Sequence, residues 1–307
     1  MMLTRRQLLV AGAGAGIVLG AGPDTLAADS IPSSLITKTI RGTNERLPLI
    51  GLGTNRWVAA GDKSVIDELR SALAVFRELG GRVIDTAPSY QSSEKALGRL
   101  IAELGMRDAF FLATKVDREE KEAGIARMQD SLRKLNSERA DLMQIHSMMG
   151  VDQQIGTLID WKGQGLIRYI GITTARTSQF AEIEQVMKTF PIDFIQINYS
   201  LSDRTAEERL LPLAIDRNIS VMVNRPLAYS NLFKDVRGET LPDWAIQRGY
   251  SSWAEFFLKY VVSHPAVTCA IPGTTRTEHV RDNMLAAHGE LPDAAFRRLQ
   301  EQWFEKL

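Results

Sequence analysis

Eight short apolar runs, each separated from the next by a segment long enough for a helix, dominate the sequence from residue 47 onward. This alternation is typical of repeated βα units, whose strands pair in parallel beneath covering helices. Eight such units predict a (β/α)₈ barrel, and a doubly wound open sheet is the alternative arrangement of the same elements. The expected strands are Leu47–Thr54, Arg82–Ala87, Phe110–Lys115, Leu142–Ser147, Ile167–Thr173, Phe194–Tyr199, Ile219–Pro226 and Thr268–Thr274.

The clearest helix is expected over Asp62–Leu79, where apolar residues recur at helical spacing and the glycine pair Gly80-Gly81 favours a stop. Its buried face is expected to carry Val65, Ile66, Leu69, Leu73 and Phe76. Ahead of the first strand, Leu35–Arg46 is predicted to form a small hairpin, because its residues alternate before a Gly-Thr-Asn turn. This hairpin is expected to close the bottom of the barrel.

Residues 1–34 are assigned to a signal peptide and linker, which leaves residues 35–307 as a single barrel domain. The pair Arg5-Arg6 precedes a small-residue apolar stretch, and Ala27-Ala28 offers a cleavage region. This pattern indicates a twin-arginine signal and predicts export by that machinery to the periplasm, with a cytoplasmic location as the alternative. The stretch is short and rich in glycine for a membrane span, so no stable membrane insertion is expected.

The charge balance argues against several kinds of partner. The 307 residues include 37 basic and 37 acidic ones without a long run of either sign, so nucleic acid is not an expected partner. A single cysteine, Cys269, excludes an intramolecular disulfide, and with four scattered histidines it predicts no metal site. A small-molecule ligand is therefore expected.

Four polar residues end or follow consecutive predicted strands. Asp85 ends the second strand, Tyr90 lies in the loop after it, and the third and fourth strands end at Lys115 and His146. Each residue taken alone has a structural explanation, such as a helix cap or a solvated strand end. Because the carboxyl ends of barrel strands form one rim, however, these side chains are expected to meet in an active site.

This set of side chains suits proton transfer to a carbonyl group. A lysine cation lowers the pKa of a neighbouring phenol, so Lys115 is expected to tune Tyr90 as the proton donor. Asp85 would hold the lysine, and His146 would donate a hydrogen bond to the carbonyl oxygen. No side chain supplies a hydride, so carbonyl reduction requires a nicotinamide cofactor at the same rim.

The segment Asp85–Tyr90, followed by Ser93–Gly98, resembles the signature of the aldo-keto reductases. Further motifs of that family occur in the same order at residues 51–54, 113–116, 144–146 and 170–173, and the likeness extends over nearly all of residues 35–287. The resemblance implies a (β/α)₈ fold and NADPH-dependent reduction of aldehydes or ketones to alcohols by the four residues above. A nucleotide-binding sensor or regulatory subunit with little turnover is the alternative on the same fold.

The resemblance also assigns residues to the cofactor. Gly53 and Thr54 would lie near the nicotinamide ribose, and Thr173 and Gln196 would hold the carboxamide. The loop from residue 271 to residue 274 would meet the adenosine phosphate through backbone N–H groups. Arg225 either contacts the pyrophosphate or faces solvent. The expected cofactor set is completed by Pro226, Leu227, Gly273, Thr274, Arg276, Asp282 and Asn283.

Two departures from the family pattern affect the cofactor. Gly273 and His279 stand where many members carry the cations that bind the phosphate distinguishing NADPH from NADH. Arg276 is the candidate replacement because a guanidinium binds phosphate bidentately, so NADPH is expected and NADH is the alternative. Asn224 stands where a stacking tyrosine is common, so the nicotinamide is expected to pack differently.

The sequence says least about the substrate. Trp57, Met148 and Met149 follow predicted strands and are candidates for an apolar pocket mouth, with a role as core filler equally open. The chain ends soon after its last expected helix, which favours an open site. Small or reactive aldehydes are the expected carbonyl substrates.

Overall fold

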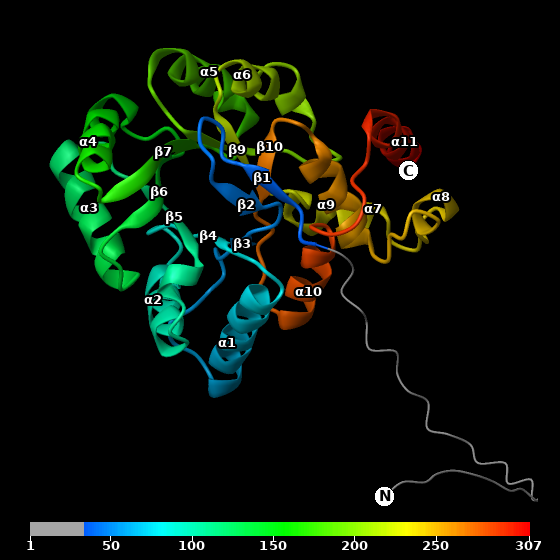
Figure 1. Cartoon of the computed structure of the whole chain (residues 1–307), viewed down its shortest axis with the longest axis horizontal. Helices are drawn as coiled ribbons and strands as arrows, with labels where there is room; N and C mark the ends of the chain where they lie inside the picture. The colour runs from blue at the N-terminus through cyan, green and yellow to red at the C-terminus, as the bar shows by residue number, and fades with distance from the viewer. Residues whose placement is uncertain (1–33) are drawn as a thin grey trace, which may run out of the picture. The chain divides into compact units, whose positions relative to one another are not determined.

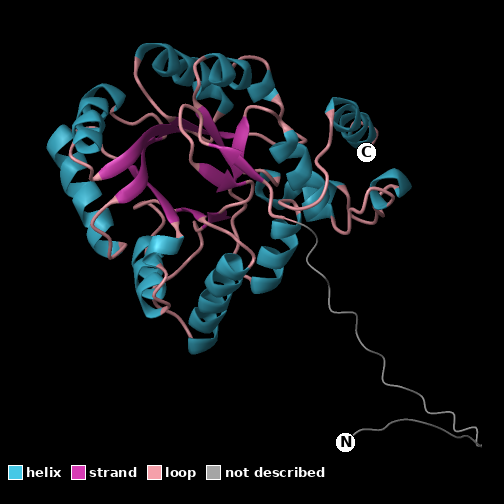
Figure 2. Cartoon of the chain, viewed as in Figure 1, coloured by secondary structure: helices cyan, strands magenta, loops and turns pink. Residues whose placement is uncertain are grey.

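The computed structural model describes residues 34–307, and the predicted twin-arginine signal lies outside this range. Eight parallel strands stand at the centre with helices around them (Figure 1, Figure 2). These strands are β3 (Leu52–Gly53), β4 (Val83–Asp85), β5 (Phe111–Val116), β6 (Ala140–His146), β7 (Ile167–Thr173), β8 (Phe194–Asn198), β9 (Ser220–Asn224) and β10 (Val267–Ala270). They pair in sequence order, and bridges Ile50–Ala270 and Gly53–Gly273 join the first strand to the last. The (β/α)₈ barrel is therefore confirmed.

Helices cover the outer surface of the barrel. They are α1 (Lys63–Glu78), α2 (Ser93–Glu103), α3 (Lys121–Lys134), α4 (Val151–Gly163), α5 (Phe180–Thr189), α6 (Leu210–Asp216), α7 (Asn231–Asp235), α8 (Asp243–Ile246), α9 (Trp253–Ser263), α10 (Thr277–Leu285) and α11 (Ala294–Phe304). Short 3₁₀ turns lie at Arg107–Ala109, Thr177–Gln179, Thr205–Glu207 and Ala228–Ser230. None of the helices in residues 34–307 is long and apolar enough to cross a membrane.

Helix α1 lies within one residue of its predicted bounds at each end. Leu69, Leu73 and Phe76 are buried as expected, but Val65 is 42% exposed because it lies in the first turn, beside loop residue Gly61. The helix stops where predicted: Gly80 has a φ of 84°, and a Cβ on Gly81 would lie 2.3 Å from the Phe76 ring. Both positions therefore require glycine.

An antiparallel hairpin of β1 (Thr37–Thr39) and β2 (Arg46–Pro48) precedes the barrel. It corrects the prediction of a continuous first strand over Leu47–Thr54. Residues 46–48 pair with β1 in the hairpin, so only the later part of that segment reaches the parallel sheet.

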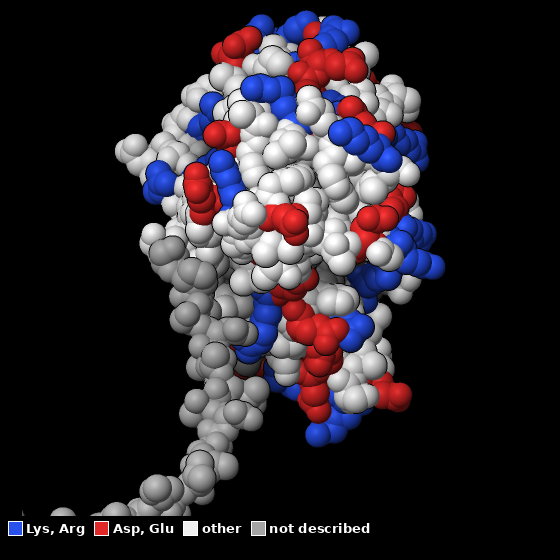
Figure 3. Space-filling model, turned by 90° about the vertical axis from the view of Figure 1, so that its right-hand side faces the viewer, with Lys and Arg blue, Asp and Glu red and all other residues white. Residues whose placement is uncertain are grey.

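The hairpin closes the amino-terminal end of the barrel, as predicted. Ile40 and Leu47 are fully buried in one cluster with lumen residues from the barrel strands, among them Phe111 and Phe194. The Lys38 ammonium donates hydrogen bonds of 2.7 to 2.8 Å to three backbone carbonyls at the end of α9 and the start of β10. The hairpin thus covers the bottom of the barrel in the described part of the chain. On the face shown in Figure 3, charges of both signs are interspersed.

Candidate active site

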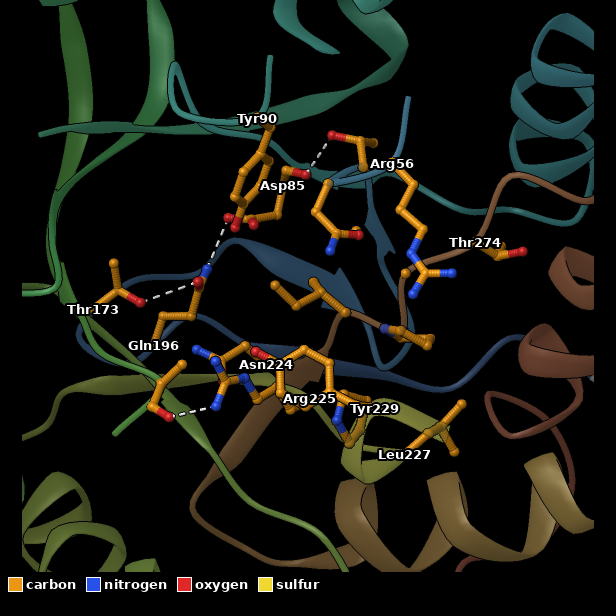
Figure 4. Close-up of a pocket in the computed structure, with 18 of the residues that line it drawn as sticks. Arg56, Asp85, Tyr90, Thr173, Gln196, Asn224, Arg225, Leu227, Tyr229 and Thr274 are labelled. Atoms are coloured by element: carbon orange, nitrogen blue, oxygen red, sulfur yellow. Dashed lines mark hydrogen bonds between the residues drawn. The ribbon is translucent and has the colours of Figure 1, made fainter. Parts of the chain in front are cut away.

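A cavity of about 490 Å³ opens at the carboxyl ends of the barrel strands (Figure 4). Its wall combines residues from seven strands or the loops that follow them, as the rim argument predicts. The predicted site residues in this wall are Gly53, Thr54, Asp85, Tyr90, His146, Thr173, Gln196, Arg225, Pro226, Leu227, Gly273, Thr274 and Arg276.

Lys115 lies behind the wall, where it is 1% exposed and paired with Asp85. Its ammonium donates to both carboxylate oxygens of Asp85, at 2.9 and 2.8 Å, and to the Thr86 carbonyl at 2.7 Å. Burial alone would lower the pKa of Lys115, but the Asp85 carboxylate and the Tyr90 phenol outweigh it and raise this pKa. The lysine is therefore a cation at any physiological pH.

The Asp85 carboxylate also accepts hydrogen bonds from two amides. Gln196 donates to its Oδ1 at 2.7 Å and Gln144 donates to the same atom at 3.2 Å. Gln196 is itself oriented by the Thr173 hydroxyl, which donates to its Oε1 at 3.1 Å (Figure 4). Of the two residues assigned to the cofactor carboxamide, Gln196 thus bonds directly to the Asp85 carboxylate, and Thr173 is linked to it through Gln196.

Tyr90 lies over the Lys115 ammonium, which is 5.2 Å from the centre of the phenol ring. The lysine cation lowers the pKa of Tyr90, but burial and the charge of Asp85 together outweigh it, so this pKa is raised above its usual value of 10.0. The expectation that Lys115 would bring the pKa below its usual value is therefore wrong, because it left out desolvation and the nearby carboxylate. The consequence favours donation, since Tyr90 keeps its proton at neutral pH.

His146 lies beside Tyr90, with ring centres 6.2 Å apart and ring planes at 87°. Ser89 Oγ is 3.4 Å from its Nδ1. Burial, followed by the charge of Lys115, lowers the pKa of His146 to about 4. The imidazole is consequently neutral at physiological pH and can donate one N–H to a carbonyl oxygen without carrying a charge into the site.

Backbone forms much of the wall where β3 faces the loop after β10. A Cβ on Gly53 would lie 2.9 Å from the Ile271 carbonyl oxygen and 3.2 Å from the Gly273 Cα, so only glycine fits. The Thr54 hydroxyl donates to the Asp85 carbonyl at 2.9 Å. These contacts hold the edge of the cavity close to the Asp85 end of β4.

Four arginines line the cavity, each in a loop after a different strand. Arg56 follows β3, Arg176 follows β7, Arg225 follows β9 and Arg276 follows β10. Sequence reasoning missed the first two because it compared strand motifs, although a cation just beyond a barrel strand is a readable signal. Asp85 is the one acidic residue in the described part of this wall and is neutralised by Lys115, so the cavity suits an anionic ligand.

The loop expected to bind the adenosine phosphate carries acidic partners. Arg276 forms an ion pair with Glu278, and His279 Nε2 lies 3.6 Å from the same carboxylate. The backbone N–H of Thr277, at the start of α10, donates to Glu68 at 2.6 Å. A phosphate bound in this loop would compete with both carboxylates for these donors.

The loop after β9 has an unusual backbone. Arg225, Ala228, Tyr229 and Ser230 all have positive φ values, between 47° and 69°. The Arg225 guanidinium donates to the Ala175 carbonyl at 2.7 Å, and its carbon lies 4.1 Å from the centre of the Tyr229 ring. Asn224 donates to the Thr174 carbonyl at 3.0 Å and lines the cavity. Tyr229, which sequence reasoning missed, is 62% exposed at the rim.

Five predicted contacts lie away from the cavity wall, and one of them, Met149, is 39% exposed. Trp57 is 1% exposed because its indole N–H donates to the Thr274 carbonyl and its ring joins the core. Met148 is also buried in the core, and Ser147 lines the cavity in its place. Asp282 and Asn283 lie on α10, where Asn283 faces a small pocket with residues of α1 and β3.

The chain is similar to known proteins in sequence and in fold. Residues 49–303 match the aldo/keto reductase family. Aldo-keto reductase YhdN of Bacillus subtilis is 30% identical over 205 residues, which span 60% of this chain and 60% of that relative. Methylglyoxal reductase YeaE of Escherichia coli is 28% identical, over 84% of this chain and 91% of that protein.

Solved structures agree with these sequence matches. An aldo/keto reductase from Klebsiella pneumoniae, in complex with NADP and acetate, aligns with a TM-score of 0.74 at 26% identity. The alignment covers 88% of this chain and 95% of that one. The protein belongs to the aldo/keto reductase family of NAD(P)H-dependent oxidoreductases.

Proposed function

We propose that this protein reduces small aldehydes or ketones to alcohols with NADPH, and that Tyr90 donates the proton. The observation that carries the proposal is the phenol at the cavity wall, with a buried lysine cation behind it and a neutral imidazole beside it. The raised pKa keeps Tyr90 protonated, as a donor must be. The same residues give a sensor no evident advantage.

The cavity wall fits a dinucleotide phosphate. Its four arginines provide fixed positive charge, and its one carboxylate, Asp85, is already neutralised. Arg225 would bind the pyrophosphate, Arg276 the additional phosphate of NADPH, and Thr173 with Gln196 the carboxamide. The complex with NADP formed by the Klebsiella pneumoniae relative supports this choice of cofactor.

A dinucleotide held by Thr173, Gln196 and Arg225 would supply a hydride to the carbonyl carbon. Tyr90 releases its phenolic proton to the carbonyl oxygen, so the carbonyl π bond is replaced by a C–H and an O–H bond. Lys115 stabilises the phenolate left on Tyr90 because its ammonium lies beneath the ring. His146 donates a hydrogen bond to the carbonyl oxygen as negative charge develops there.

Small and reactive aldehydes are the proposed substrates. The relative YeaE is named as a methylglyoxal reductase, and two further relatives in Salmonella carry the same description. Trp57 and Met148 were expected to line the cavity near Tyr90, but both pack in the core and neither is part of the cavity wall. A wall rich in polar groups favours short carbonyl compounds over bulky apolar ones.

The proposal is tested with the purified chain, NADPH and a panel of dicarbonyls, aldehydes and ketones. We expect carbonyl-dependent loss of NADPH absorbance, and we expect Tyr90→Phe to lower kcat roughly 100- to 10,000-fold while NADPH binding is retained. Binding of NADPH without turnover of any carbonyl would favour the sensor. Full activity of Tyr90→Phe would exclude Tyr90 as the donor.

We also propose that the chain is exported through the twin-arginine machinery. The support is the Arg5-Arg6 pair and the apolar stretch after it. A reporter that is active only in the periplasm, fused after the barrel, should give a signal that is lost when both arginines are replaced by lysine. A reporter that stays in the cytoplasm would contradict the proposal.

A further inference from the structure

Gln144 contacts the catalytic carboxylate without lining the cavity. It lies on β6, two residues before His146, and its side chain is fully buried. Its amide nitrogen donates to Asp85 Oδ1 at 3.2 Å, beside the bonds from Lys115 and Gln196 to the same atom. Since a carboxylate only accepts hydrogen bonds, this contact fixes which end of the amide faces Asp85.

The neighbouring strand makes room for this side chain. Gln144 pairs in register with Gly171 on β7. A Cβ on Gly171 would lie 2.9 Å from the Gln144 Cγ, closer than real Cβ contacts allow. The φ of Gly171 is negative, so the backbone conformation does not require glycine there. The reason for glycine is space, because any larger residue would displace the Gln144 side chain from Asp85.

The amide of Gln144 is only half satisfied. Its Oε1 is buried and has no hydrogen-bond partner among the described residues. A buried acceptor without a partner lowers the stability of a fold, so an apolar side chain of the same size would suit this position better if packing alone decided. The bond from this amide to the Asp85 carboxylate therefore points to a role in the site.

We propose that Gln144 is a positioning residue, which holds the Asp85 carboxylate in line with Lys115 and offsets part of its negative charge. The inference rests on the proposed role of Tyr90 as proton donor. It makes Gln144 the second amide donor to Asp85, after Gln196.

The charges around Tyr90 determine whether loss of the Gln144 amide raises or lowers the pKa of Tyr90. The groups that act on the phenol are Lys115 on β5, Asp85 on β4 and Tyr229 after β9, and the imidazole of His146 on β6 is neutral. Asp85 raises the pKa of Tyr90, and the Gln144 N–H partly offsets that carboxylate. Removing the amide should therefore raise the pKa of Tyr90 further.

The test is Gln144→Met, which keeps the volume of the side chain and removes the donor. We expect kcat to fall roughly 3-fold, the factor that corresponds to about half a pKa unit, with the KM for aldehyde and the Kd for NADPH unchanged, because Gln144 does not line the cavity. The melting temperature should be unchanged or higher, because the unpartnered oxygen is removed as well. Unchanged kcat, or a fall in kcat that accompanies a large loss of stability, would overturn the proposal.

A titration without cofactor separates this inference from the proposed function. The absorbance of tyrosinate is followed as the pH rises, and the signal of the Tyr90→Phe counterpart is subtracted to leave that of Tyr90 alone. Circular dichroism confirms that the protein remains folded. In the Gln144→Met background the midpoint should rise by about half a pH unit. An unmoved midpoint refutes the role of Gln144 even if every carbonyl compound fails to react.

Gln300 offers a matched control. It too is fully buried, its amide nitrogen donates a single bond of 3.0 Å, to the Phe256 carbonyl, and its Oε1 has no partner in the described chain. Gln300→Met should change the melting temperature in the same direction as Gln144→Met, and it should leave kcat and the titration of Tyr90 unchanged. Gly171→Ala should lower kcat as Gln144→Met does, and the double variant should be no slower than either single variant, because both act through one contact.

Discussion

Replacing Lys115 by Met should cost the protein both its stability and its activity. The substitution removes three hydrogen bonds, two to Asp85 and one to the Thr86 carbonyl. Asp85, which is 2% exposed, is then left with two neutral amides as its donors. An ionised carboxylate buried without its counter-ion typically lowers the unfolding free energy by about 3–5 kcal/mol.

Urea unfolding followed by circular dichroism measures this loss. Asp85→Asn in the Lys115→Met background removes the stranded charge, so it should restore at least half of the lost stability while kcat stays low. Lys259→Met is the matched control, because Lys259 pairs with Glu255 at 2.9 Å and both are buried outside the site. That variant should lose stability and keep kcat. A loss below about 1 kcal/mol for Lys115→Met, or no recovery in the double variant, would refute the reasoning.

Two further predictions concern charge at the site. Because the pKa of His146 is lowered from 6.5 to about 4, its ring proton resonances should not titrate near pH 6.5. Its contribution to stability should be present above that pH and be lost as the pH falls toward 4. The His146 resonances are identified as those missing from the spectrum of His146→Gln, and their titration near pH 6.5 would contradict this prediction. Glu278→Gln should free Arg276 and tighten NADPH binding roughly 3-fold in a fluorescence titration, with NADH unaffected. Equal tightening of both cofactors would argue against Arg276 as the phosphate ligand.

The strand order and the catalytic rim could be predicted because they depend on local patterns. Apolar runs of strand length mark the barrel, and the residue that ends each run identifies the rim. Asp85 and His146 are the last residues of β4 and β6, and Lys115 is the next to last of β5. The hairpin could be predicted as well, although the sequence could not show at which residue the hairpin ends and the first barrel strand begins.

The remaining features depend on contacts between distant segments. Trp57 follows a strand and so resembled a pocket residue, but its indole bonds to a carbonyl more than 200 residues away and turns the ring into the core. The net pKa of Tyr90 depends on how deeply the phenol is buried, which no spacing rule reports. The positive φ of Tyr229 could not be predicted, because no glycine at that position indicates a left-handed backbone.

The hairpin joins the two ends of the folding unit. Lys38 bonds to carbonyls 224 to 229 residues further along the chain, and the Ile36 N–H donates to the Ala287 carbonyl. During synthesis, therefore, the hairpin lacks these long-range partners until almost the whole chain has left the ribosome. Contacts of such long range make folding slow, and the lower end of the barrel is completed after translation, when its earliest and latest residues meet.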